Sequence, residues 1–202
     1  MIINKNSPDV DLKQMGGKAK NLYLLSQADL PVPDWFCLGA DVFGQTYQAL
    51  LPQLQDLSIE ELSRLGPGLL AEVFPKEKLS GYMRDLLKQD VFYAVRSSAL
   101  GEDSLRDSFA GQFDTWLYIS ADAVLLHILR CWQSVFSVRL LHYLQQRGLK
   151  YQDIRLAVIV QKMVPAEAAG VLFMANPVGS LTEIVINAGP GLGEGIVSDQ
   201  VA

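Results

Sequence analysis

The pattern of hydrophobic and polar positions predicts a mixed fold in which short strands alternate with amphipathic helices. Apolar residues recur at helical spacing across residues 18–29, and the Pro31-Val32-Pro33 turn stops this helix. Further helices are predicted over 41–51 with Asp41 as the N-cap, from Ser58 with a capping box completed by Glu61, and over 76–89. The first hundred residues therefore combine a strand at 35–38 and a strand at 91–95 with a helical insert between them.

The second half of the chain predicts more strands around one long helix. A single helix is expected over 121–147, because its apolar residues keep to one face, and Gly148 ends it at a favoured position. Strands are predicted over 113–119, 155–163, 170–175 and 183–187. These elements predict an α+β fold with two lobes of approximately residues 1–95 and 96–202, divided near residues 90–115.

The composition narrows the possible classes of function. The chain has 202 residues, and half of them are hydrophobic, which is enough for a substantial core. A net charge of -5 argues against broad binding of nucleic acid or anionic membranes, because both need a basic surface. The two cysteines lie in apolar patterns and fit buried thiols in a reducing compartment. Without a basic-then-apolar leader, the chain is expected to be cytoplasmic.

An arginine and two serines at the end of an apolar strand form the first candidate site. Arg96 offers phosphate oxygens a planar fork of donors, and Ser97 and Ser98 add hydroxyl groups. This combination has no obvious structural duty, which favours a phosphate-binding role. The alternative is that Arg96 pairs with Glu102 or Asp103.

The polar loop that follows is the second candidate. Residues 108–112 can fold over phosphates, with Gly111 allowing close approach of the backbone and Thr115 adding a hydroxyl. The alternative is an ordinary hairpin loop in which Phe109 packs into the core.

A glycine pair followed by lysine opens the first predicted helix. In Gly16-Gly17-Lys18, free N–H groups, the positive end of the helix dipole and the Lys18 ammonium can converge on an anion. We expect Lys18 to act across a cleft from Arg96. The alternative is an ordinary glycine turn with a solvated lysine, since the spacing of a P-loop is absent.

Gln161 and Met163 lie where an apolar strand leaves the core. Backbone groups at such a position can bond the edge of adenine while Met163 lies against its face. The alternative is that both residues merely finish the strand.

Two other features carry weaker expectations. The segment 187–195 is too rich in glycine to predict regular structure, and it is interpreted as a mobile loop near a ligand or a simple turn. His127 and His142 lack cysteine or carboxylate partners at metal-ligand spacing, so both are expected to have packing or surface roles.

Taken together and in order, these motifs resemble the nucleotide-binding domain of the family that includes phosphoenolpyruvate synthase, pyruvate phosphate dikinase and rifampicin phosphotransferase. The matching segments are 16–22, 30–33, 94–99, 102–103, 108–112, 160–164, 169–173 and 191–194. The resemblance implies an ATP-grasp type of fold in which ATP lies between two lobes. The residues that it assigns to ATP are Lys18, Arg96, Ser97, Gly111, Thr115, Gln161 and Met163, with Arg96 also as the catalytic residue.

Enzymes of this family continue into D-x-E and Q-x-R segments, which hold magnesium and the transferred phosphate, and then into a phosphohistidine domain. We therefore expect a C-terminally truncated ATP-binding domain whose magnesium ligands lie beyond Ala202. The expected function is the ATP-binding part of a phosphotransferase that passes a phosphoryl group to a histidine on a mobile domain and then to an acceptor. By itself this part is expected to be inactive. The alternative is a non-catalytic nucleotide-binding or interaction module with the same fold.

Overall fold

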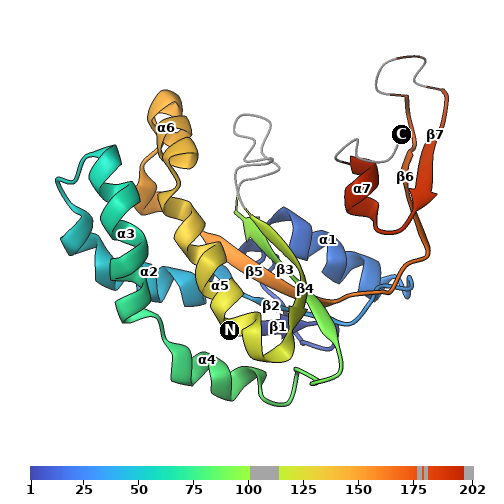
Figure 1. Ribbon diagram of the computed structural model, residues 1–202, viewed down its shortest axis with the longest axis horizontal. Helices are drawn as coiled ribbons and strands as arrows, with labels where there is room; N and C mark the ends of the chain where they lie inside the picture. Colours follow the sequence, from blue (N-terminus) through green and yellow to red (C-terminus); the bar gives the residue numbers. More distant parts are fainter. Residues whose placement is uncertain (101–113, 177–178, 180–181, 198–202) are drawn as a thin grey trace. The chain divides into compact units, whose positions relative to one another are not determined.

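The computed structural model describes residues 1–100, 114–176, 179 and 182–197 (Figure 1). Its contacts divide the chain into two compact units, Met1–Met163 and Val164–Ala202. The predicted lobe boundary between residues 95 and 96 lies inside a strand that pairs with neighbours on both sides. The first unit consequently continues past that boundary, as far as Met163.

The first unit is built on a five-stranded sheet in the order β1-β2-β5-β3-β4, with each neighbouring pair antiparallel. Its strands are β1 (Ile2–Asn4), β2 (Trp35–Leu38), β3 (Phe92–Ala99), β4 (Thr115–Ser120) and β5 (Leu156–Lys162). The central strand, β5, is buried from residue 156 to residue 160. Because successive side chains point to opposite faces, a strand covered on both faces needs an apolar residue at every position.

One face of the sheet is covered by a layer of helices, and we call it the helical face (Figure 1). This layer contains α2 (Ala40–Leu54), α3 (Ile59–Val73), α4 (Lys76–Met83), α5 (Val124–Gln133) and α6 (Val138–Arg147). Val95 and Val158 of the sheet share one buried core with Phe43 and Trp132 of the helices. The rings of Phe43 and Trp132 meet edge to face, with centroids 5.5 Å apart. The helix predicted over 76–89 is shorter in the structure, where α4 ends at Met83.

The opposite face of the sheet packs against α1 (Gly16–Gln27), and we call it the α1 face. Here Trp35, Cys37 and Ile159 share a smaller buried core with Met15 and Ala19. Alternation along β2 therefore sorts its residues between two cores, and the sheet is sandwiched between helices. The predicted α+β class is confirmed at this level.

Both cysteines are buried thiols, as the composition predicted. Cys37 lies in the core of the α1 face and Cys131 in the core of the helical face. Burial raises the pKa of the Cys37 thiol to about 12, so it stays protonated and unreactive at neutral pH.

The prediction of one helix over 121–147 is wrong. This region forms η2 (Ala121–Ala123), α5, η3 (Ser134–Phe136) and α6. Ser137 is extended between η3 and α6, and its hydroxyl caps α6 by accepting from the Leu140 N–H at 3.3 Å. The Ser134 hydroxyl donates to the Cys131 carbonyl at 2.7 Å, a local bond of the kind that bends helices. Apolar periodicity alone does not detect such breaks.

Among the described helices, none is by itself long and apolar enough to cross a membrane. The segments 121–136 and 138–147 reach that length and composition only when counted together, and they are bent by 44°.

The two predicted helix caps have different outcomes. The capping box of α3 is confirmed, because the Ser58 hydroxyl accepts from the Glu61 N–H at 3.2 Å and the Glu61 carboxylate accepts from the Ser58 N–H at 2.9 Å. The prediction of Asp41 as an N-cap is wrong, because Gly39 occupies that position. Asp41 lies in the first turn of α2, where its carboxylate accepts a bond from the Met1 amino group at 2.7 Å.

The second unit is a hairpin of β6 (Ala168–Phe173) and β7 (Val185–Pro190), followed by the short helix α7 (Gly193–Val197). The prediction that segment 187–195 lacks regular structure is therefore wrong. Gly189 pairs with Ala169 inside the hairpin, and the Cβ of Ala169 lies close to Gly193. The glycine-rich segment therefore includes regular structure, the end of β7 and the start of α7.

Candidate functional site

Arg96 lies within β3 and not at its end, which corrects the strand predicted over 91–95. The strand continues to Ala99 because its ladder with β5 continues. Arg96 pairs with Ile159 on one side and with Thr115 on the other. The side chain is therefore fixed to one face of the sheet by the register of three strands.

The alternation of side chains decides which predicted residues meet. Tyr93, Val95 and Ala99 belong to the core of the helical face, so Arg96 points to the α1 face. Directly paired residues share a face, which places Thr115 there too. Gln161 pairs with Ala94 and also with Trp35, whose side chain belongs to the core of the α1 face. The structure thus brings Arg96, Thr115 and Gln161 together on one face.

The beginning of α1 lies against the same face, next to Ser98. The Ser98 hydroxyl, which is fully buried, accepts from the Ala19 N–H at 3.3 Å. Gly16 has a left-handed φ of +68°, and a Cβ on it would lie 2.6 Å from the Ser98 Oγ. Only glycine fits both conditions. Lys18 is in the first turn of this docked helix, so the predicted helix start reaches β3 near Arg96.

Ser97 does not join the other predicted residues. It faces the helical side with Val95 and Ala99, and it is only 2% exposed. Its hydroxyl donates to the Asp114 carbonyl at 2.8 Å, and the Asp114 carbonyl also accepts from the Ser97 N–H at 3.4 Å. Because adjacent residues of a strand point to opposite faces, the Arg96-Ser97 pair cannot present both side chains to one ligand.

Met163 follows the last residue of β5 and is held by two hydrogen bonds. Its N–H donates to the Phe92 carbonyl at 2.9 Å, and its sulfur accepts from the Tyr118 N–H at 2.9 Å. Phe92 and Tyr118 contact each other edge to face, with ring centroids 6.2 Å apart. Sequence analysis did not select these two aromatic residues. Phe92 lies four residues before Arg96, and residues an even number apart on a strand share a face. This spacing could have identified Phe92 from the sequence.

Several predicted positions lie outside the described residues. Gly111 and the loop over 108–112 fall in this part, as do Glu102 and Asp103, the alternative partners of Arg96. The roles of these residues stay predictions.

The two histidines are placed as packing and surface residues. His127 is buried, donates from Nδ1 to the Ala123 carbonyl at 2.9 Å and lies with Nε2 3.2 Å from the Arg130 guanidinium. Its ring also packs edge to face against Trp116, and His142 is exposed. Within the described ranges, no three histidine, cysteine, aspartate or glutamate side chains gather in a way that could hold a metal ion.

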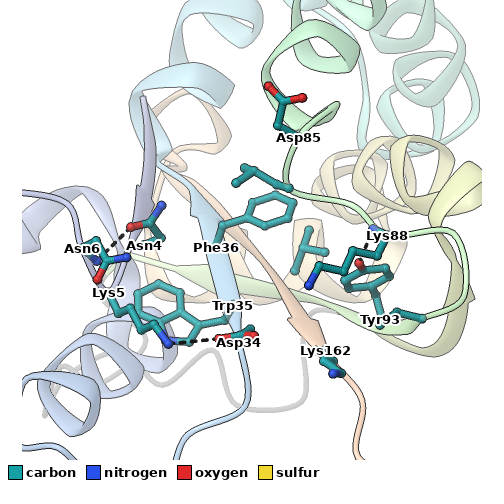
Figure 2. A pocket seen from close by; sticks show the side chains of 13 residues that line it. Asn4, Lys5, Asn6, Asp34, Trp35, Phe36, Asp85, Lys88, Tyr93 and Lys162 are labelled. Carbon is teal, nitrogen blue, oxygen red and sulfur yellow. Dashed lines mark hydrogen bonds and ion pairs between the residues drawn. The ribbon is translucent and has the colours of Figure 1, made fainter.

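A cavity of about 210 Å³ lies near the ends of β1 and β5 (Figure 2). The residues that line it include Phe36, Tyr93 and Val160, which belong to the core of the helical face. At its rim the Lys5 ammonium lies 3.0 Å from the Asp34 carboxylate. This hydrogen bond and charge lower the pKa of Asp34, and more distant lysines add to the effect. None of the predicted site residues lines this cavity.

Comparison with known proteins confirms the family resemblance that the sequence motifs indicated. Residues 12–202 match the family model described as "Pyruvate phosphate dikinase, AMP/ATP-binding domain". The chain is 35% identical to the probable phosphoenolpyruvate synthase of Archaeoglobus fulgidus, with 95% of this chain and 28% of that protein aligned. It is 38% identical to the rifampicin phosphotransferase of Bacillus subtilis, over 95% of this chain and 24% of that protein. For the prodigiosin synthesizing transferase PigC of Serratia marcescens, identity is 39% over 93% of this chain and 21% of that protein. The chain thus spans about a quarter of the length of these curated relatives.

Proposed function

Because this chain belongs to the family of the pyruvate phosphate dikinase AMP/ATP-binding domain, we propose that it binds ATP on the α1 face of its five-stranded sheet. The observation that carries this proposal is the convergence of Arg96, Thr115 and Gln161 on that face, beside the start of α1 and Lys18. In this proposal the fold is of the ATP-grasp type.

The chemistry of the face suits a nucleoside triphosphate. The Arg96 guanidinium can bind phosphate oxygens through two parallel hydrogen bonds, and Lys18 adds a point charge at the positive end of the α1 dipole. Thr115 supplies a hydroxyl group next to Arg96 in the register. Gln161, with the Met163 region, lies toward the other end of the face and borders the adenine. Gly111 completes the phosphate loop in this proposal.

We assign this chain to the ATP-binding part of a larger phosphotransferase. Its relatives are named as synthases and phosphotransferases, and the chain covers about a quarter of their length. In the complete protein, a phosphoryl group would pass from ATP to a histidine on another domain and then to an acceptor, with magnesium held by residues outside those described. Phosphoryl transfer depends mainly on positioning and charge neutralisation, and Arg96 and Lys18 supply charge.

Titration calorimetry with ATP tests the assignment of Arg96. We expect Arg96→Ala to weaken ATP binding by about 1.5–3 kcal/mol, roughly 10- to 150-fold, which is the range for hydrogen bonds to charged groups. Arg139→Ala is the matched control, because Arg139 is exposed on α6 at the helical face. If Arg96→Ala binds ATP as tightly as the wild-type chain does, the phosphates are not bound by Arg96.

A further inference from the structure

We propose that Phe92 and Tyr118 form the platform on which the base of the nucleotide stacks. This inference rests on the proposed function, and it adds two residues to the base-binding end of the α1 face. The two rings are 54% and 55% exposed, and their centroids are 6.2 Å apart in an edge-to-face contact. Large aromatic side chains usually bury most of their area, so an exposed pair is an available stacking surface.

The position of the pair along the sheet matches the order of groups in a nucleotide. Phe92, Ala94 and Arg96 lie on the same face of β3, and Phe92 is about 13 Å from Arg96 at roughly 3.3 Å per residue. Ala94, which lies between them on this face, contributes only a methyl group and is 8% exposed. The face therefore runs from an aromatic end, across a small residue, to a cationic end.

A polar group stands at the middle of this surface. Gln161 is paired with Ala94 and is partly exposed, so its side chain leaves the α1 face on the neighbouring strand β5, at a level between Phe92 and Arg96. An amide has both donors and an acceptor, which suits the polar edge of a base or a ribose hydroxyl. An apolar surface with a few placed polar groups is typical of ligand sites.

The backbone of Tyr118 has an energetically unfavourable conformation, and its ring is exposed. Tyr118 has a φ of +56°, a left-handed value that a residue with a bulky side chain rarely adopts. The pairing of β3 and β4 is irregular at this point, and the Met163 sulfur accepts the Tyr118 N–H at 2.9 Å. Strain of this kind is concentrated at functional sites.

The test compares ATP with inorganic tripolyphosphate, which has the phosphates and lacks the base. We expect Phe92→Ala and Tyr118→Asn each to weaken ATP binding by about 5- to 100-fold, the range for loss of base–aromatic stacking, and to leave tripolyphosphate binding unchanged. Tyr118→Phe keeps the ring and should bind ATP like the wild type. Tyr82→Asn is the matched control, since Tyr82 is an exposed tyrosine on α4 in the helical layer.

Saturation-transfer NMR supplies a second readout that a structural role would not change. The adenine H2 and H8 protons should receive strong saturation from the wild-type chain, and this transfer should fall in Tyr118→Asn at equal occupancy.

The outcomes separate this inference from the proposed function. If ATP binds no tighter than tripolyphosphate, or if Phe92→Ala and Tyr118→Asn both bind ATP like the wild type, the aromatic platform is wrong while phosphate binding on the α1 face stands. If the wild-type chain binds neither ATP nor tripolyphosphate, both the platform and the proposed function are overturned.

Discussion

At the scale of single residues, the site depends on where α1 meets β3. Gly16 combines a left-handed backbone with close contact to Ser98, and the buried Ser98 hydroxyl bonds the first turn of α1. Gly16, two residues before Lys18, therefore has a structural role that also positions the first turn carrying the lysine.

Substitution of Gly16 tests this contact. Gly16→Ala places a Cβ against Ser98 and forces an alanine into the left-handed region, so we expect the free energy of unfolding to fall by about 2–4 kcal/mol. Gly44→Ala is the control, because Gly44 lies within α2 with open space around it and should gain about 0.5–1 kcal/mol. Denaturant unfolding of the two variants measures both changes. Equal stability of both variants would contradict the proposed packing.

At the scale of elements, α3 shows how a local motif sets a helix boundary. Its capping box satisfies two N–H groups at the helix start, and the bonds from Ser58 lower the pKa of the Glu61 carboxyl. The break between α5 and α6 shows the opposite case, in which hydroxyl bonds interrupt a continuous apolar stripe. Ser58 thus caps the start of α3, whereas Ser134 and Ser137 make their hydrogen bonds at the break between α5 and α6.

The capping box predicts a pH dependence. Ser58→Ala should lower the free energy of unfolding by about 1 kcal/mol at neutral pH. Glu61→Gln should also destabilise, because the ionised carboxylate accepts the Ser58 N–H and the folded pKa of Glu61 lies below its ordinary value of 4.5. That contribution is present above the unfolded pKa and is lost as pH falls through the lowered folded value. Denaturant unfolding of Glu61→Gln and wild type, from pH 7 down to pH 3, should show the difference shrinking. A difference that stays constant over this range would exclude the ionised cap.

At the scale of the whole molecule, both described cores belong to the first unit. Every residue of the two clusters lies between Ile3 and Val160. The second unit has a hairpin and a short helix, and Leu172, Met174 and Ile186 are more than half exposed on it. A two-stranded hairpin is marginal by itself in water, so the stability of the chain should come from residues 1–163.

Truncation after Met163 tests this division. We expect residues 1–163 to fold cooperatively with a thermal midpoint within a few degrees of the full chain, since both cores are retained. Circular dichroism melting measures this. Limited proteolysis of the full chain should cut first between Val164 and Glu167. An unfolded truncated chain would show that the second unit contributes to the main core.

Much of the fold could be predicted from the sequence, because local periodicity and capping set local conformation. The apolar run of β5, the capping box of α3 and the glycine start of α1 were each predicted, and each is confirmed. The motif residues Arg96 and Gln161 were also selected from residue type and position. Conformational propensity and hydrophobic periodicity act over a few residues, so short stretches of sequence are enough to determine these features.

The tertiary structure alone decided which of the selected residues share a face. Strand register placed Arg96 with Thr115 and Gln161, whereas the neighbouring Ser97 turned to the helical side. Sequence spacing identifies residues that alternate along a strand. Which face meets α1, and which meets the larger core, depends on contacts between segments far apart in the chain. For this reason the motif residues could be predicted from the sequence, but only the tertiary structure decides which of them lie together in the site.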